Sequence, residues 1–366
     1  MCSASESSWD PNRPYQELPP LPPAQDVEPP DVLRQVVEAR AVLAKMDEAA
    51  RRLPNPEVLL SALTVLEAQA SSEIENVVTT TDELFSYMDH LDEASPDVKE
   101  ALRYRDGLFR GVEIVEERGT LTRATAETIC GEISGRSMTL RRTPGTIIAS
   151  ALTGAPVYTP PEGFEVIDRK MGEWENYVNS PGAHDPLVRM ALSHYQFEAI
   201  HPFDDGNGRT GRILAILQLI NEGMLSRPTL YLSRYIIAHK RQYYSLLRRV
   251  TEEGDFVAWI RFILDAVQST ARSTVLLIDE LQAVEEQLKR VAADALPAGG
   301  NLWFVETLMM RPYTRMAAVQ QRCGVSRPTA RKWLSAMVDA GVLRRMEKGR
   351  DVLFVHDGYL EVLANA

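Results

Sequence analysis

Residues 201–212 read His-Pro-Phe-Asp-Asp-Gly-Asn-Gly-Arg-Thr-Gly-Arg, and the mostly apolar run Ile213–Ile220 follows them directly. The stretch combines one imidazole, two carboxylates, three glycines and two guanidinium groups. Glycine and asparagine favour a loop, whereas an apolar run of this kind is typical of a buried helix. The sequence therefore predicts a polar loop at the N-terminus of a buried helix.

Two side chains of this loop offer chemistry. The neutral imidazole of His201 can accept a proton from a hydroxyl near pH 7. Asp205 offers hard oxygen ligands, which suit a Mg²⁺ ion that also holds phosphates. Taken singly, His201 could be a hydrogen-bonded structural histidine and Asp205 a helix cap. A metal site made of both lacks a matching third ligand in the sequence.

The rest of the loop suits the binding of phosphate. The Gly-Asn-Gly of residues 206–208 lets the backbone approach an anion and point its N–H groups at it. The helix that starts there adds its positive end. Arg209 and Arg212 supply planar donors for phosphate oxygens. Each feature has a structural alternative, but the ordered set favours phosphate chemistry by positioning and charge stabilisation.

The composition limits the class of protein. The chain has 366 residues, 45% hydrophobic and 25% charged, with a net charge of −11. The acidic balance argues against a protein that coats nucleic acid through its overall field. Cys2, Cys130 and Cys323 form no CxxC pair, and the apolar runs are too short to span a bilayer. We therefore expect a cytoplasmic protein without membrane contact.

Most of the chain has helical periodicity, which predicts a mainly α fold. Residues 1–30 are the exception, because Leu18–Pro23 favours polyproline II; we expect a flexible or surface-hugging arm, with a docking peptide as the alternative. Asn55-Pro56 is typical of a helix start. The predicted helices cover about 31–52, 56–76, 83 onward, 95–117, 122–134, 166–179, 186–200, 208–222, 230–248 and 257–296.

A short β-hairpin interrupts the helices. Residues 146–149 and 156–159 have strand character, with turn residues between them. An isolated two-stranded hairpin is only marginally stable, so we expect it to pack against the helical body.

Residues 301–366 have their own pattern, after a break at residues 297–300. Helices predicted at about 302–311, 314–323 and 327–340 precede a two-stranded wing, with strands over 341–343 and 352–355 and a charged turn over 347–351. This order resembles winged-helix domains. A winged helix can bind DNA or protein, so DNA binding is one alternative function of the chain. The basic residues that would support it are Arg327, Arg331, Lys332, Lys348 and Arg350.

The loop also carries a family resemblance. Residues 201–212 match the HPFx[DE]GNGRxxR signature of the Fic family at every defined position, and residues 192–200 are similar to that family's lead-in helix. The resemblance covers roughly residues 30–290. It implies a Fic-type helical bundle that transfers AMP from ATP to a Ser, Thr or Tyr hydroxyl of a protein, with release of pyrophosphate.

The resemblance also implies roles for single residues. His201 would be the general base and Asp205 would hold Mg²⁺. The residues implied at the nucleotide are Gly206, Asn207 and Gly208 at the α- and β-phosphates, Arg209 and Arg212 at the phosphate tail, Thr210 and Gly211 on the first helical turn, and Tyr243 and Tyr244 near the adenosine.

The hairpin at about 146–159 lies where the family has its flap, which docks a protein substrate by adding a strand. Ala149-Ser150 stands where the family often has glycine, which leaves the detailed contacts with the target open. The resemblance also makes self-modification and a homodimer expectations for this chain.

A second motif lies upstream. Ser71 and Glu75, within Ser-Ser-Glu-Ile-Glu-Asn, fit the family's inhibitory pattern [ST]xxxE[GN]. Glu75 would pair with Arg212 and keep it from the γ-phosphate. A contact of this kind is worth about 1.5–3 kcal/mol, or roughly tenfold to a hundredfold in productive ATP binding.

These observations predict four segments: an arm over 1–30, an N-terminal helical region with the inhibitory helix over 31–110, a catalytic core over 111–296 and a winged helix over 301–366. The expected function is a self-inhibited protein AMP-transferase. The same fold could instead remove AMP or transfer another phosphate-containing group.

Overall fold

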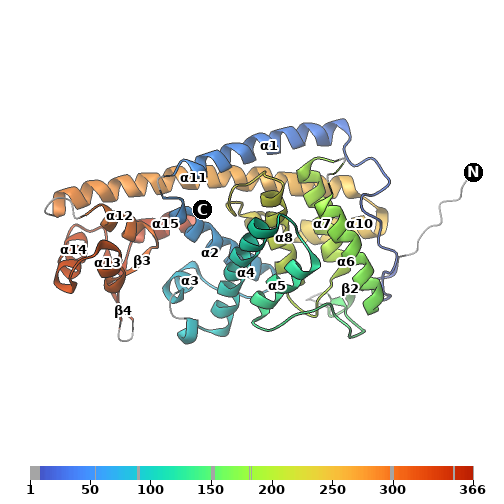
Figure 1. Ribbon diagram of the computed structural model, residues 1–366, viewed down its shortest axis with the longest axis horizontal. Coiled ribbons are helices and arrows are strands. Elements are labelled where there is room, and N and C mark those ends of the chain that lie inside the picture. Colours follow the sequence, from blue (N-terminus) through green and yellow to red (C-terminus); the bar gives the residue numbers. More distant parts are fainter. Residues whose placement is uncertain are drawn as a thin grey trace, which may run out of the picture.

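The computed structural model describes residues 9–53, 55–88, 91–149, 153–180, 182, 184–296, 301–348 and 351–365. Helices dominate it, as the periodicity predicts (Figure 1). The helices before residue 297 are α1 (Pro30–Arg51), α2 (Pro56–Ile74), α3 (Thr81–Tyr87), the short 3-10 helix Leu91–Glu93, α4 (Pro96–Arg118), α5 (Arg123–Ser134), α6 (Phe164–Asn179), α7 (Pro186–Ile200), α8 (Asn207–Asn221), α9 (Leu232–Ala238), α10 (Lys240–Glu253) and α11 (Phe256–Ala295).

Local capping explains where the important helices begin. The Asn55 side chain accepts a hydrogen bond from the backbone N–H of Glu57, and Pro56 takes the first position of α2. Asp185 and Pro186 start α7 in the same way. Both starts follow from the sequence, so the N-terminal ends of α2 and α7 are set locally.

The 40-residue helix α11 runs along most of the molecule, with α1 packed beside it (Figure 1). Helices α7 and α8 lie in the main hydrophobic core, where almost every residue of both is buried. The loop of residues 201–206 connects them, so it is held between two buried helices. This placement gives the loop a fixed support on both sides.

Two predictions about secondary structure are wrong. The expected single helix over 230–248 is broken at His239 into α9 and α10. Strand β3 (Tyr313–Arg315) and helix α15 (Asp357–Asn365) were not predicted. The break at His239 separates α9, which packs on both α2 and α11, from α10, which packs on α11. Periodicity alone does not predict such a break.

Residues 9–29 lie along the helical body, which agrees with the surface-hugging alternative. Leu18 and Val27 are buried in the main core. The backbone N–H of Tyr15 donates to the carbonyl of Thr159, and the Gln196 amide donates to the carbonyl of Pro19. The described part of the arm therefore has a fixed path from the hairpin to α1.

The hairpin consists of β1 (Ile148–Ala149) and β2 (Pro156–Tyr158), which pair antiparallel. Residues 150–152 of its turn lie outside the described residues. Tyr158 is half-buried against the main core, so the hairpin packs on the helical body as expected.

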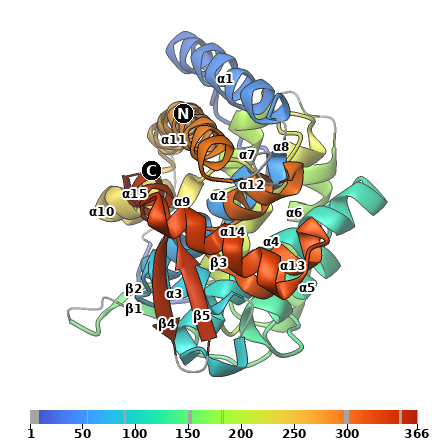
Figure 2. The ribbon, with the colours of Figure 1, turned by 90° about the vertical axis from the view of Figure 1, so that its left-hand side faces the viewer.

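The C-terminal part contains α12 (Leu302–Met309), β3, α13 (Met316–Cys323), α14 (Arg327–Asp339), β4 (Arg344–Lys348), β5 (Asp351–Val355) and α15. Its sheet has the order β3-β5-β4 and lies beside α13 and α14 (Figure 2). The wing strands are thus longer than predicted, and the first begins at Arg344 rather than at residue 341. The predicted break at 297–300 and the wing residues Gly349 and Arg350 lie outside the described residues.

This C-terminal part shares a hydrophobic cluster with helices that precede it in the sequence. The cluster joins Leu63 of α2, Phe85 of α3, Leu281 of α11, Phe304 of α12 and Tyr359 of α15. In the described ranges, no helix has the length and apolar character needed to cross a membrane.

Candidate active site

His201 follows the last turn of α7 and has a left-handed backbone, with φ 50°. Its backbone N–H closes the helix on the carbonyl of Phe197. Burial lowers the pKa of His201 from its usual value to about 4, and the positive charge of Arg141 acts in the same direction, whereas Glu75 and Asp205 oppose it. The imidazole is therefore neutral at pH 7, the form that accepts a proton.

The loop is locked by its own residues. The Asn207 side chain accepts from the backbone N–H of Phe203 and donates to the carbonyl of the same residue, both over 2.8 Å. Phe203 is fully buried. The first backbone hydrogen bond of α8 runs from the N–H of Thr210 to the carbonyl of Gly206. The N–H groups of residues 207–209 therefore remain at the open N-terminal end of the helix. This is the arrangement that anion binding at a helix N-terminus needs, and the binding itself stays a prediction.

Asp205 and Arg209 lie together at this end of α8. The Asp205 side chain is 67% exposed, and one of its oxygens lies 3.7 Å from the Arg209 guanidinium. Arg209 is almost fully buried and also pairs with Glu100 of α4. Among the described residues no three His, Cys, Asp or Glu side chains form a metal cluster. A single exposed carboxylate fits Mg²⁺ only when the phosphates of a nucleotide supply the other ligands.

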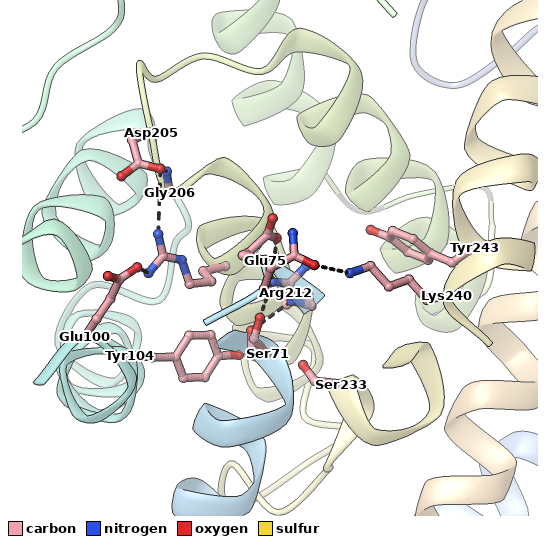
Figure 3. A network of polar contacts seen from close by, with 12 residues as sticks. Ser71, Glu75, Glu100, Tyr104, Asp205, Gly206, Arg212, Ser233, Lys240 and Tyr243 are labelled. Carbon is pink, nitrogen blue, oxygen red and sulfur yellow. Dashed lines mark hydrogen bonds and ion pairs between the residues drawn. The ribbon is translucent and has the colours of Figure 1, made fainter. Parts of the chain in front are cut away.

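Arg212 lies one turn further into α8 and is 1% exposed. Its Nε donates to the Ser71 hydroxyl over 2.8 Å, and its Nη2 donates over 2.9 Å to the Ser71 carbonyl and to a Glu75 carboxylate oxygen. Figure 3 shows both partners reaching Arg212 from the C-terminal end of α2. The pairing of Glu75 with Arg212 that the motif implies is formed.

Glycine at position 208 makes room for this contact. A Cβ at Gly208 would overlap the Glu75 carboxylate. Glu75 therefore lies directly against the N-terminal turn of α8, where the phosphates of a nucleotide are expected. Beside it, Lys240 of α10 donates to the Asn76 side chain over 3.2 Å, and this bond ties the end of α2 to α10 (Figure 3).

A buried carboxylate that sequence reasoning missed attaches α2 to two neighbouring helices. Glu67 is 2% exposed and accepts hydrogen bonds from the Tyr104 hydroxyl of α4, over 2.9 Å, and from the Ser233 backbone N–H of α9, over 2.9 Å; the Ser233 hydroxyl also donates to it. Burial raises the pKa of Glu67, while these hydrogen bonds and the charge of Arg212 lower it. Glu67 thus fixes α2, and with it Ser71, between α4 and α9.

The residues after Arg209 face the protein interior. Thr210 is fully buried. A Cβ at Gly211 would overlap the carboxylate of Glu198 on α7. Burial raises the pKa of Glu198 to about 7. In the structure, Thr210 and Gly211 therefore allow α8 to pack closely on its neighbours. Their contact with a nucleotide stays a prediction.

The two tyrosines predicted near adenosine differ in position. Tyr243 is 1% exposed, and its hydroxyl lies 2.9 Å from Nε2 of His194 in the core. Tyr244 is 39% exposed, and its ring contacts that of Tyr243 edge to face. Of the two, only Tyr244 presents its ring to solvent, so Tyr243 would support a nucleotide pocket from beneath.

Sequence reasoning missed Glu67, Glu100 and Arg141. Glu67 carried a signal, because it is the one carboxylate in the mostly apolar stretch 58–70 of α2 and a buried carboxylate needs partners. Glu100 and Arg141 carried none, since each lies in an ordinary charged stretch and meets its partner only through the fold.

Family models match most of the chain in succession. The Fic/DOC family N-terminal model matches residues 33–113, the Fic/DOC family model matches residues 121–219, and the model of the C-terminal domain of SoFic-like protein adenylyltransferase matches residues 301–359. The second match includes the whole loop and α8 up to Leu219.

Curated relatives and solved structures agree with these matches. The chain is 32% identical over 131 residues to "Protein adenylyltransferase Fic" of Aedes aegypti, and 33% identical over 117 residues to the protein of that name from Drosophila grimshawi. The matched regions are 35% and 32% of this chain but only 24% and 23% of those proteins, so the chain spans about a quarter of the length of the curated relatives it matches.

Two solved structures share the fold. A Fic family protein from Desulfovibrio desulfuricans superimposes with a TM-score of 0.58 at 20% identity, over 93% of this chain and 98% of that one. Fic-1 from C. elegans superimposes with a TM-score of 0.50 at 16% identity, over 68% and 74% of the two chains. With the three family models in their expected order, these findings show that the chain belongs to the Fic/DOC family.

Proposed function

We propose that this protein transfers AMP from ATP to a Ser, Thr or Tyr hydroxyl of a protein and that α2 inhibits the transfer. The observation that carries the proposal is the N-terminal end of α8. There, the N–H groups of residues 207–209 lie at the open end of the helix, and the Arg212 guanidinium is held by Ser71 and Glu75. The neutral His201 is close enough to Glu75 and Asp205 for their charges to act on its pKa. The curated relatives named protein adenylyltransferase support the same reaction class.

The chemistry follows from these groups. The target hydroxyl attacks the α-phosphorus of ATP, its proton passes to His201, and the bond to the pyrophosphate oxygen breaks. The end of α8 and Arg209 hold the phosphates. Mg²⁺, bound by Asp205 and by the phosphates, would neutralise charge on the departing pyrophosphate.

Inhibition follows from the position of Glu75. Its carboxylate neutralises Arg212 and lies against Gly208, where the phosphate tail of ATP would approach. Two negative groups cannot share this place without a large cost, so Glu75 must leave before ATP binds productively. The Glu75 side chain is 33% exposed, whereas Arg212 is buried, so Glu75 is the partner that can move.

The test compares transfer of labelled AMP by the full chain and by three variants. We expect Glu75→Gly to raise self-labelling and target labelling about tenfold to a hundredfold, because it frees Arg212. Glu73→Gly is the matched control, since Glu73 lies on the exposed side of the same helix. His201→Ala in the Glu75→Gly background should abolish transfer while ATP still binds. Equal labelling by Glu75→Gly and Glu73→Gly, with both folded, would reject the inhibitory role.

The reaction has an alternative direction. The same groups could remove AMP from a target, with Glu75 orienting water, or could transfer another phosphate-containing group. Mass spectrometry of a target incubated with the unmodified chain and with the Glu75→Gly variant separates these reactions. Transfer adds one AMP and should be stronger with the variant, whereas removal deletes one AMP and should occur only with the unmodified chain, which keeps Glu75. We propose docking of the target on the hairpin at about 146–159, and we extend the proposal to a homodimer and a cytoplasmic location.

A further inference from the structure

We propose that Arg141 is a positioning residue that, together with Tyr158, fixes the hairpin and the catalytic histidine in one geometry. The inference rests on the proposed transfer. It concerns how the hydroxyl of a target docked on the hairpin is brought into line with the base.

The first argument is the set of carbonyl groups at the end of α7. The last carbonyls of a helix have no partner within it. Here the Tyr158 hydroxyl donates to the carbonyl of Ala199 over 2.7 Å. The Arg141 guanidinium donates to the carbonyl of Ile200 over 3.3 Å and to that of His201 over 2.8 Å. Side chains from outside α7 therefore supply the hydrogen-bond donors that the last carbonyls of the helix lack, and one of them binds the carbonyl of His201 itself.

The second argument is where these side chains come from. Arg141 precedes β1, and Tyr158 is the last residue of β2. Arg141 also donates to the carbonyl of Pro161, just after β2, over 2.5 Å. Its backbone N–H donates to the carbonyl of Pro202 over 2.9 Å. Both ends of the hairpin are thus attached to the segment 199–202, which carries His201.

The third argument is the environment of Arg141. It is 2% exposed, and its side-chain hydrogen bonds within the described residues all go to backbone carbonyls. A buried cation is costly to place, so its position is tightly determined by these acceptors. A cation at a helix C-terminus is also favoured by the helix dipole. His201 adopts a left-handed backbone, which non-glycine residues adopt only when their surroundings hold them there.

The charge of Arg141 has a second consequence. It lowers the pKa of His201, in addition to the effect of burial, while Glu75 and Asp205 raise it. Arg141 therefore helps to keep the base neutral as well as in place. A variant that removes the charge and a variant that only changes its shape should consequently behave differently.

The experiment uses the full chain with Glu75→Gly, labelled ATP, and the inactive His201→Ala chain as acceptor. Arg141→Gln removes both the positive charge and the forked guanidinium, whereas Arg141→Lys removes the guanidinium but keeps the charge. Arg142→Gln is the matched control, because Arg142 is the neighbouring arginine but packs over the Phe164 ring at 3.8 Å rather than on α7. Tyr158→Phe removes a single hydrogen bond and keeps the ring.

We expect both Arg141 variants to lower kcat by about tenfold to a hundredfold, with ATP affinity within about twofold, because misplacement of a reacting group acts on the rate. In Arg141→Gln the low-pH limb of the kcat/KM profile should also move to higher pH, since the pKa of His201 rises. In Arg141→Lys that limb should stay. Tyr158→Phe should lower kcat less, with no shift of the limb.

Equal kcat and equal pH profiles for Arg141→Gln and Arg142→Gln would overturn the inference. If the Arg141 variants do not fold, Tyr158→Phe decides, because an unchanged kcat in that variant would overturn the link between hairpin and base. Failure of the proposed function looks different, since the Glu75→Gly chain would then not label the acceptor at all.

Discussion

Arg212 is a buried cation, and two residues at the C-terminal end of α2 offset the free energy that its burial costs. Ser71 supplies a hydroxyl and a carbonyl, and Glu75 supplies one carboxylate oxygen. A guanidinium without these partners would keep its charge, because arginine does not lose its proton in proteins. The residues that restrain Arg212 therefore also stabilise the fold around it.

Ser71→Ala tests this double role. The substitution leaves Nε of Arg212 buried without a partner, which should lower the free energy of unfolding by about 1–3 kcal/mol. Because it also loosens α2, we expect AMP labelling to rise. Denaturant unfolding and labelling by the same preparation provide the measurements.

Ser72→Ala is the control for that substitution. Ser72 is equally buried, but its hydroxyl has no partner within the described residues. Its removal should change neither stability nor labelling by a comparable amount. A loss of stability in Ser72→Ala as large as that in Ser71→Ala would contradict the assignment.

The C-terminal half of α2, which holds Arg212 in place, is itself attached to three other helices. Glu67 binds α4 and α9, and Ser71 and Glu75 bind α8. The helix itself was predictable from its apolar period and its cap at Asn55. The pairing of Glu75 with Arg212 was implied by the upstream motif, but the contacts of Glu67 with α4 and α9 were not predicted, because their partners lie on helices distant in sequence.

Helix α14 is the element through which the alternative function, DNA binding, would act. Arg327, Arg331 and Lys332 are exposed on it. DNA binding through this helix predicts a shift of a labelled duplex at low salt that weakens as salt rises, because phosphate contacts release counterions. The double variant Arg331→Ala/Lys332→Ala should reduce the shift.

A charge-matched control is available on α1, where Arg34 and Arg51 are exposed. Arg34→Ala/Arg51→Ala changes the net charge by the same amount without altering α14. An equal effect of both double variants would mean that only net charge matters. No shift by the unmodified chain at low salt would exclude this alternative.

At the scale of the whole molecule, the described residues form two hydrophobic clusters with one buried free thiol in each. Cys130 lies in the cluster under the catalytic loop, where its thiol donates to the Asp205 carbonyl over 3.2 Å. Cys323 lies in the cluster that joins the C-terminal part to α2, α3, α4 and α11. The two thiols can therefore report the opening of each cluster separately.

Phe304→Ala in a Cys2→Ser background tests how independent these clusters are. Phe304 is fully buried in the C-terminal cluster, so its truncation should cost about 3–5 kcal/mol. We expect faster modification of Cys323 by a thiol reagent, with Cys130 affected much less, as followed by mass spectrometry. Equal acceleration at both cysteines would show that the clusters open as one unit.

Sequence reasoning recovered the parts of the site that depend on neighbours along the chain. The loop between α7 and α8 and the start of α2 follow from glycines, caps and periodicity. It did not recover the partners of Arg141, Glu67 and Glu100. Arg141 and His201 are separated by 60 positions, and Glu100 and Arg209 by 109.

The sequence alone determined which chemical groups the loop 201–212 offers and that a helix begins behind them, because caps and helical periodicity act over a few residues. The tertiary structure decided that Asn207 locks the loop, that Arg212 is buried against Glu75, and that Arg141 holds the end of α7. These contacts depend on burial, and burial removes the water that would otherwise satisfy each polar group, so the packed helices must supply its partners.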